Sequence, residues 1–169
     1  GVYEKSMPNT LSLKEKMIAA KECGYDFLEL SVDETDEKLS RLEWTEEQRL
    51  SVLTDSRKIG VPISTMCLSG HRKYPLGSEN PETAARGMVI MEKALKLAQD
   101  LGIRVIQLAG YDEYYQPSNE KTREIFLKNL QRAVEMASAY KVVLGFETME
   151  TPFMDTCAKA MEYVQKIDS

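Results

Sequence analysis

Two carboxylates follow an apolar segment near the end of the sequence. Residues 142–146 read VVLGF and predict a buried strand; Glu147 comes directly after it, and Glu150 lies three residues further on. A carboxylate at the mouth of a buried strand costs free energy unless a cation, a hydrogen-bond donor or a metal ion pairs with it. Glu147 is therefore either one half of a structural salt bridge, for which Lys5 is the partner to consider, or a carboxylate that does chemistry. The elements that position it must decide between the two.

The composition is that of an ordinary soluble globular domain. The 169 residues are 43% hydrophobic and 29% charged, with a formal net charge of −5. This charge argues against a nucleic-acid surface, which needs a basic face. No apolar run is long enough to cross a membrane, and the start has no signal-peptide pattern. Three scattered cysteines, none in a CxxC pair, indicate reduced cytosolic thiols and not a zinc site or a disulfide framework.

A helix followed by a strand recurs along the chain. Capping boxes at Ser12–Glu15 and Thr45–Gln48 begin two helices, and an Asn-Pro pair at 80–81 begins a third. Glycine follows three of the helices, where it accepts the left-handed backbone that ends a helix. Two further helices are expected to begin at Ser118 and Asp155. Strands are expected at the chain start and within residues 25–34, 61–70, 103–110 and 142–147.

This alternation predicts parallel strands joined by right-handed crossovers. The repeat is roughly 35–40 residues long, as in a TIM-type (β/α) barrel. The rival, a doubly wound open sheet, would carry a glycine-rich loop after the first strand, and residues 2–10 contain no glycine. A complete barrel has eight units and about 250 residues. We therefore expect one α/β domain over residues 1–169, the first five units of a parallel (β/α) barrel, with residues missing before Gly1 and with the C-terminal units absent.

In such barrels the chemistry lies at the carboxyl ends of the strands. Loop ends are polar in most proteins, so no single polar residue there proves a site. The five predicted ends together nevertheless carry more polar residues than a structural sheet needs. These ends hold Tyr3, Glu4, Lys5, Glu29, Ser31, Asp33, Cys67, Ser69, His71, Arg72, Lys73, Gln107, Tyr111, Asp112, Glu147 and Met149.

Four of these residues have two possible interpretations each. His71, the only histidine, either lines a substrate pocket or is a hydrogen-bonded loop residue. Arg72 and Lys73 either hold a phosphate or form a solvated pair in a turn. Glu29 either contacts a sugar hydroxyl or is the buried partner of Lys5.

Several long segments are similar to one enzyme family. The resemblance rests on GVYEKSMP, CGYDFLELSVDETDEKLSRLEW, STMCLSGHRKYPLGS, LAQDLGIRVIQLAGYDEYY and GFETMETPFM. These segments resemble the L-ribulose-5-phosphate 3-epimerase family, also labelled L-xylulose-5-phosphate 3-epimerase or hexulose-6-phosphate isomerase-like, within the xylose isomerase-like TIM barrel superfamily. The resemblance covers the whole chain. It implies a cytoplasmic sugar-phosphate epimerase that acts in the bacterial breakdown of L-ascorbate or related pentoses.

The resemblance also implies a divalent metal ion held by four strand-end ligands. Glu147 matches the first ligand and one of two acid–base carboxylates, and the other ligands belong to strands beyond Ser169, so the site is incomplete in this chain. His71 does not match the metal-binding histidine, but it lies with Arg72 in a segment that lines the substrate pocket. Lys5, Glu29 and Gln107 are further substrate-binding candidates. Mn²⁺, Mg²⁺, Co²⁺ and Zn²⁺ all suit such ligands.

The implied reaction inverts C3 of L-xylulose 5-phosphate or L-ribulose 5-phosphate. A metal ion stabilises the enediolate that forms when the C3 proton leaves, and inversion needs a base on one face and an acid on the other. The closest alternative is an aldose–ketose (hexulose-6-phosphate) isomerase on the same barrel. An endonuclease IV-like nuclease would need several histidines and a basic face, which the sequence lacks. A third alternative is a non-catalytic truncated product, and a homo-oligomer would cover its open sheet edges.

Overall fold

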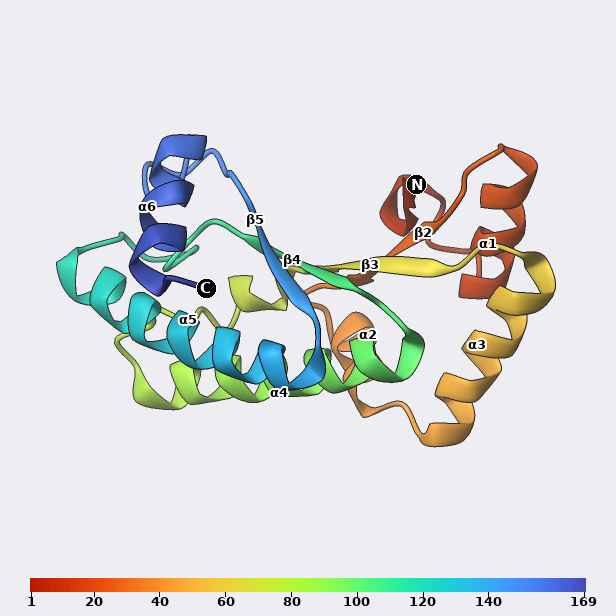
Figure 1. The fold of residues 1–169 in the computed structure, drawn as a ribbon, viewed down its shortest axis with the longest axis horizontal. Helices are drawn as coiled ribbons and strands as arrows, with labels where there is room; N and C mark the ends of the chain where they lie inside the picture. The colour runs from red at the N-terminus through yellow and green to blue at the C-terminus, as the bar shows by residue number, and fades with distance from the viewer.

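The computed structural model describes residues 1–169 and shows one five-stranded parallel sheet. The strand order is β1-β2-β3-β4-β5, so each strand pairs with the next one along the chain. This confirms the predicted α/β class and the winding of a TIM-type barrel. Figure 1 shows the sheet as a strongly twisted ribbon of strands with helices packed along it. The strands are β1 (Val2–Tyr3), β2 (Leu28–Val32), β3 (Ile63–Leu68), β4 (Val105–Ala109) and β5 (Val143–Glu147).

Six α-helices connect or follow the strands. They are α1 (Leu13–Glu22), α2 (Asp36–Leu39), α3 (Glu46–Ile59), α4 (Pro81–Leu101), α5 (Glu120–Tyr140) and α6 (Cys157–Ile167). Short 3-10 turns lie at Glu4–Ser6, Ser40–Glu43 and Ser69–Arg72. Consecutive long helices contact one another, from α1 and α3 through α4 and α5 to α6. The helices therefore follow the order of the strands, as they do in a TIM-type barrel.

The caps explain where the helices begin. Both predicted capping boxes form, at the starts of α1 and α3, and Asn80 accepts from the backbone N–H groups of Glu82 and Thr83 at the start of α4. The predicted starts of the last two helices are slightly wrong. Asn119 caps α5 and Thr156 caps α6, in each case one residue after the expected position, because these side chains accept the first free N–H groups.

The two faces of the sheet differ in polarity because side chains alternate along each strand. Leu30, Met66 and Ile106 point toward the helices and are fully buried. The intervening residues lie on the other, inner face. Pairing places Ser31 beside Cys67, Cys67 beside Gln107, and Gln107 beside Gly145 in one row. The helix-covered face is thus apolar and the inner face polar.

The strand β5 is more exposed than its sequence predicts. Val142 is buried, but Val143 is 61% exposed, Leu144 and Phe146 are half-buried, and Glu147 is exposed. The expectation of a fully buried strand is therefore wrong. The physical reason is that β5 lies at the edge of the sheet and pairs on one side only, with β4.

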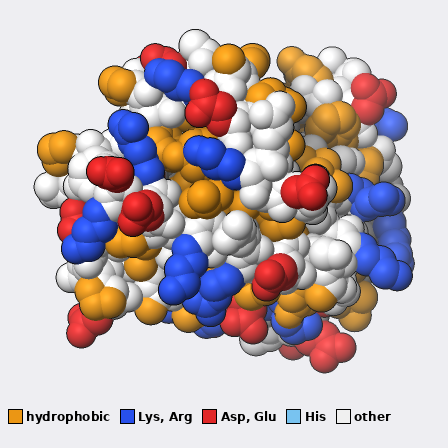
Figure 2. Space-filling model, turned by 60° about the vertical axis from the view of Figure 1, so that its left-hand side comes forward, with side chains coloured by type: hydrophobic (Ala, Val, Ile, Leu, Met, Phe, Trp, Pro, Cys, Tyr) orange, Lys and Arg blue, Asp and Glu red, His pale blue; other side chains and the backbone are white.

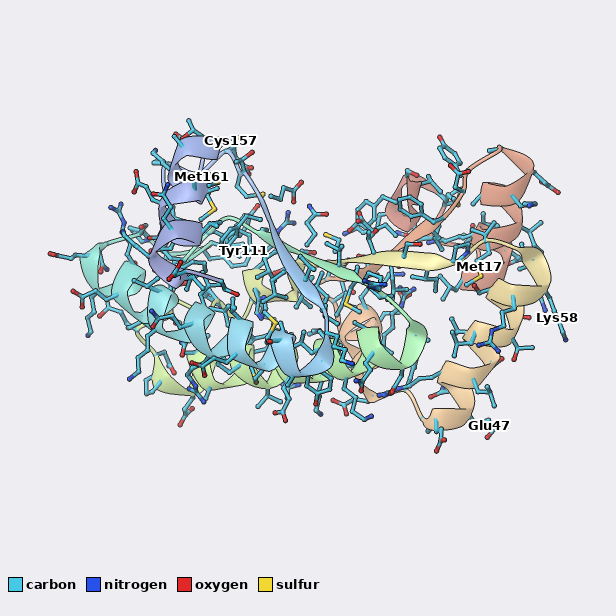
Figure 3. All side chains as sticks on the ribbon, in the orientation of Figure 1. Met17, Glu47, Lys58, Tyr111, Cys157 and Met161 are labelled. Atoms are coloured by element: carbon cyan, nitrogen blue, oxygen red, sulfur yellow. The ribbon has the colours of Figure 1, made fainter.

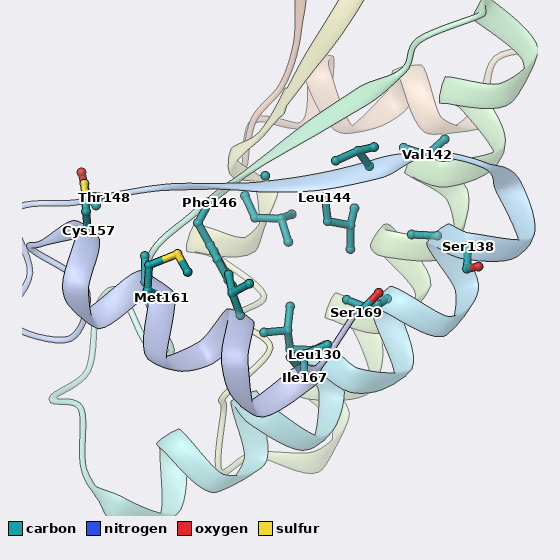
Figure 4. A pocket seen from close by; sticks show the side chains of 17 residues that line it. Leu130, Ser138, Val142, Leu144, Phe146, Thr148, Cys157, Met161, Ile167 and Ser169 are labelled. Carbon is teal, nitrogen blue, oxygen red and sulfur yellow. The ribbon is translucent and has the colours of Figure 1, made fainter.

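An apolar groove of about 630 Å³ runs between β5, α5 and α6. In Figure 4, Leu144 and Phe146 enter it from β5, and Cys157 and Met161 line it from α6. Figure 3 shows the latter two residues about one turn apart on that helix. Met161 is 50% exposed and Val164 is 40% exposed, so the groove is open to solvent. Figure 2 shows charged side chains of both signs around apolar side chains on the side of the molecule seen there.

We expect the 169-residue chain to self-associate through this groove and the free edge of β5, because an unpaired edge strand beside an apolar surface promotes pairing with a second copy. Met161→Glu should weaken the association constant about tenfold, as loss of a central apolar contact does in protein interfaces. Sedimentation velocity over a range of concentrations measures this. Leu50→Glu is the matched control, because Leu50 is 58% exposed on α3, away from the groove. Equal association of both variants and the wild type would contradict the prediction.

Candidate functional site

The carboxyl ends of the five strands lie at one edge of the sheet, and their polar side chains meet on its inner face. The Tyr3 hydroxyl and Ser31 Oγ lie 3.0 Å apart, which joins β1 to β2. Thr65 Oγ1 donates to Glu29 Oε2 at 2.7 Å, which joins β2 to β3. Glu29 therefore lies on the inner face of the sheet, and Thr65, not Lys5, is its partner.

Lys5 forms its ion pair with Asp33, at 2.8 Å between Nζ and Oδ2. The salt bridge between Lys5 and Glu147 that the sequence suggested does not form. Thr35 also donates to Asp33, from its backbone N–H and its hydroxyl. Burial acts to raise the pKa of Asp33, but the bonds from Lys5 and Thr35 outweigh it and lower that pKa. The pair fixes the loops after β1 and β2 at the rim of the inner face.

Glu147 ends β5 with a carboxylate that makes no hydrogen bond or ion pair within the chain. Its backbone carbonyl accepts from Gly110 N at 2.9 Å, which holds the end of β5 against the loop after β4. A Cβ at Gly110 would lie only 2.7 Å from that carbonyl oxygen, so this contact requires glycine. The backbone of Glu147 is thus fixed and its side chain is free.

Two further inner-face residues lie between Glu29 and Glu147. Gln107 is half-buried, makes no side-chain hydrogen bond, and pairs in register with Gly145, which has no side chain to cover it. Burial raises the pKa of the Cys67 thiol, and the charges of Glu29 and Glu147 raise it further. The thiol is therefore protonated at neutral pH and is a poor nucleophile. The inner face thus carries two carboxylates, Glu29 and Glu147, beside a protonated thiol.

The residues present can supply one ligand of a divalent metal site. Glu147 supplies an unpaired carboxylate oxygen, the donor type that Mg²⁺ and Mn²⁺ prefer. No group of three or more His, Cys, Asp or Glu side chains in the chain is arranged to hold a metal ion. The end of β5 therefore offers one hard oxygen ligand, Glu147, and the carboxylate of Glu29 on the same face is bonded to Thr65 through one oxygen.

His71 is buried behind this face. Its Nε2 lies 3.1 Å from the carbonyl oxygen of Gly87 on α4, and the residue is 5% exposed. Burial lowers the pKa of the imidazole to about 4, although the bond to Gly87 acts in the opposite direction. At neutral pH the ring carries no charge, so His71 cannot offer a charge-assisted hydrogen bond to a ligand. Its neighbour Arg72 lies over the ring of Tyr114, 4.8 Å from the ring centroid.

A buried ion cluster that the sequence did not reveal supports the first two strands. Glu4 is fully buried and accepts from Lys16, Lys38 and Arg41, and the backbone N–H of Ser31 donates to it at 2.6 Å. Arg41 also donates to the Ser31 carbonyl at 3.0 Å. Burial acts to raise the pKa of Glu4, but Arg41 and its other partners outweigh it and lower that pKa. No sequence spacing indicates this cluster, because its members come from four separate segments.

The apolar groove is separate from these residues. The side chains of Leu144 and Phe146 enter it, whereas Glu147 does not line it and alternates onto the inner face of β5. The polar strand ends, and not this groove, bring together the groups that can do acid–base chemistry.

The family description "Xylose isomerase-like TIM barrel" matches residues 17–169. The chain belongs to this family. The match agrees with the parallel order of the five strands and with polar groups at their carboxyl ends. No helix of the chain is long and apolar enough to span a membrane.

Relatives of this chain include sugar epimerases. It is 49% identical over 169 residues to L-ribulose-5-phosphate 3-epimerase UlaE of Escherichia coli O157:H7 and to that of Shigella sonnei. The match covers 100% of this chain and 60% of each relative, so the chain spans about three fifths of their length.

Solved structures share the fold at low sequence identity. A D-psicose 3-epimerase in the presence of D-fructose has a TM-score of 0.83 at 16% identity, over 99% of this chain and 59% of that one. A structure of L-ribulose 3-epimerase has a TM-score of 0.75 at 18% identity, over 100% of this chain and 57% of that one. A Mycobacterium smegmatis protein of the same barrel type, in complex with magnesium, has a TM-score of 0.70 at 11% identity, over 92% of this chain and 52% of that one.

The buried imidazole of His71 predicts a loss of stability in mild acid. The unfolded chain binds a proton near pH 6.5 and the folded chain only near pH 4, so the free energy of unfolding falls as pH falls through this window. Between pH 7 and pH 5 the loss from this group should be roughly 1–2 kcal/mol. Urea unfolding of the wild type and of His71→Gln at both pH values measures it. Glutamine keeps a donor for Gly87 without titrating, so the variant should lose correspondingly less stability, and equal losses would contradict the prediction.

Proposed function

We propose that this chain is part of a metal-dependent epimerase that inverts C3 of a ketopentose 5-phosphate, L-xylulose 5-phosphate or L-ribulose 5-phosphate. The observation that carries the proposal is the free carboxylate of Glu147 at the carboxyl end of β5, fixed through its backbone to Gly110. The likeness to curated L-ribulose-5-phosphate 3-epimerases over the whole chain supports it. We place the enzyme in the cytoplasm and in the breakdown of L-ascorbate or related pentoses.

In this proposal Glu147 handles the proton on one face of C3. The proton beside a carbonyl leaves most readily when the negative charge moves onto oxygen as an enediolate, and inversion returns a proton from the opposite face. A divalent ion, when bound, supplies the positive charge that stabilises this enediolate. Glu147 takes or returns the proton, and it also provides one oxygen ligand to the divalent ion. A second carboxylate, outside these 169 residues, would serve the other face.

The remaining inner-face groups orient the substrate. Gln107 has an unused amide, and Glu29 has a second carboxylate oxygen free to accept from a sugar hydroxyl, because Thr65 occupies only one. Lys5 keeps the loops after β1 and β2 together through Asp33 and can reach a ligand oxygen with its remaining donors. Arg72 supplies the positive charge for the phosphate. His71, the residue before Arg72, ties this loop to α4 through its bond to Gly87.

We also propose that the 169-residue chain by itself is catalytically inactive. Of the proposed metal ligands and the two acid–base carboxylates that inversion needs, it holds Glu147, and no group of three or more His, Cys, Asp or Glu side chains is arranged to hold a metal ion. One carboxylate in contact with water does not hold a divalent ion in a fixed catalytic position.

A chimera tests the proposed function. Residues 1–169 replace the matching part of E. coli L-ribulose-5-phosphate 3-epimerase, so that the relative supplies the rest of the barrel. The chimera should interconvert L-xylulose 5-phosphate and L-ribulose 5-phosphate, with NMR showing exchange at C3 and not transfer between C1 and C2. Glu147→Gln should lower kcat by at least about 100-fold, since a positioned acid–base group contributes about 10²–10⁴-fold.

Glu150→Gln is the matched control in the same chimera. Glu150 lies three residues further on, in the loop after β5, and should leave kcat within about twofold. Thermal unfolding of both variants checks the fold. Near-normal turnover by the Glu147→Gln variant would show that Glu147 is not the acid–base residue, and exchange confined to C1 and C2 would favour the isomerase alternative.

A further inference from the structure

The loop between β5 and α6 folds back on itself and is anchored by two buried residues. The backbone N–H of Met149 donates to the carbonyl of Met154 at 2.9 Å, and the N–H of Met154 donates to the carbonyl of Thr151 at 3.2 Å. Phe153 and Met154 are 6% and 0% exposed. Because loops usually run over the surface, two adjacent buried residues indicate a loop that is packed in place.

Phe153 anchors the loop among the aromatic rings of two helices. Its ring centroid lies 5.2 Å from that of Phe126 on α5 and 5.1 Å from that of Tyr163 on α6. The rings of Phe126 and Tyr163 are themselves 5.4 Å apart and nearly perpendicular. Aromatic pairs at these distances stabilise beyond the area that they bury. The loop is therefore tied to the helix before β5 and to the helix after it.

Met154 and Thr151 both contact Gly110, the residue that follows β4. A Cβ at Gly110 would lie 2.8 Å from Cβ and from Sδ of Met154, so this side chain packs directly on the glycine. Thr151 Oγ1 donates to the Gly110 carbonyl at 3.3 Å. The Gly110 N–H in turn donates to the carbonyl of Glu147 at 2.9 Å. We call these contacts of Glu147, Thr151 and Met154 with Gly110 the Gly110 clamp.

The direction of the Glu147 carboxylate depends on the backbone at the end of β5. The carboxylate makes no hydrogen bond or ion pair within the chain, so no other side chain orients it. The strand pairs on one side only, and it contains Gly145, whose residue type has the most backbone freedom. A group that transfers a proton must nevertheless be held close to its productive geometry.

We propose that Thr151 and Met154 are positioning residues for Glu147. Through the Gly110 clamp they fix the backbone from Glu147 to Met154, and with it the direction in which the carboxylate leaves the strand. Their action on the reaction passes through Glu147 and needs no contact with the substrate. The assignment rests on the proposed function for the role of Glu147, whereas the clamp can be measured without any activity.

Amide hydrogen exchange at Gly110, followed by NMR, measures the clamp in the 169-residue chain. The Gly110 N–H donates to the Glu147 carbonyl, so its exchange rate reports how firmly the end of β5 is held. Thr151→Val keeps a side chain of similar shape but removes the donor. It should raise this exchange rate about two- to tenfold, the effect of losing one neutral hydrogen bond. Met154→Ala leaves a cavity against Gly110 and should also raise it.

Thr54→Val is the matched control for Thr151→Val. The Thr54 hydroxyl donates to the carbonyl of Leu50 within α3, so this variant removes the same kind of bond away from β5. It should leave the exchange rate at Gly110 unchanged. An equal change in both variants, or no change in Thr151→Val, would overturn the proposal.

Turnover of the chimera with the E. coli relative tests what the clamp does for the reaction. Thr151→Val should lower kcat about fivefold or more and leave KM within about twofold, because the substrate contacts stay while the acid–base carboxylate is misaligned. Thr151→Ser keeps the hydroxyl and should restore kcat. A general loss of stability would not give this split between kcat and KM or this recovery.

Two results in the chimera would reject the positioning role: an unchanged kcat in Thr151→Val, or no recovery of kcat in Thr151→Ser. Thermal unfolding of each variant checks that it folds. A wild-type chimera that does not epimerise, beside a chain in which Thr151→Val still speeds exchange at Gly110, would reject the proposed function alone, and the clamp on the end of β5 would stand.

Discussion

The parallel register of the five strands is the constraint on which the rest of the structure depends. Because side chains alternate, the row of Ser31, Cys67, Gln107 and Gly145 must lie on one face while their neighbours Leu30, Met66 and Ile106 pack beneath the helices. A slip of one residue in any strand would exchange the two sets and bury polar groups against apolar ones. The same register brings all the carboxyl ends to one edge, so that residues far apart in the sequence share one site.

The buried cluster around Glu4 secures this register where the sheet is weakest. Strand β1 has only two residues, and two strand residues provide few backbone bonds. Glu4 compensates by accepting from the Ser31 backbone and from Arg41, which itself donates to the Ser31 carbonyl. Breaking a buried ion pair by removing one partner costs about 3–5 kcal/mol. The cluster thereby holds Lys5 and Asp33 at the rim, although none of its members faces the site.

Local signals in the sequence predicted much of the fold, and the contacts that depend on distant residues were less predictable. The boxes at Ser12 and Thr45 and the glycines at 60 and 102 marked helix limits correctly, because caps and left-handed residues act over a few residues. Local signals are weak at two places. The helix α5 ends at Lys141, a non-glycine residue with φ of 57°, and the helix α2 has only four residues. Three features depend on which strand forms the edge of the sheet and which helix packs against each strand. They are the pairing of Lys5 with Asp33, the burial of His71 and the exposure of Glu147. Spacing along the chain does not contain that information.

We propose that the free carboxylate of Glu147 at the end of β5 organises the chemistry of the inner face. Crystals of the chimera with the E. coli relative, grown with Mn²⁺, test it directly through the anomalous scattering of the metal. We expect a single strong peak on the inner face, with a Glu147 carboxylate oxygen about 2–2.5 Å from the ion. A well-ordered peak to which Glu147 contributes no oxygen, or a Glu147 side chain paired with a protein cation in the complete barrel, would contradict it.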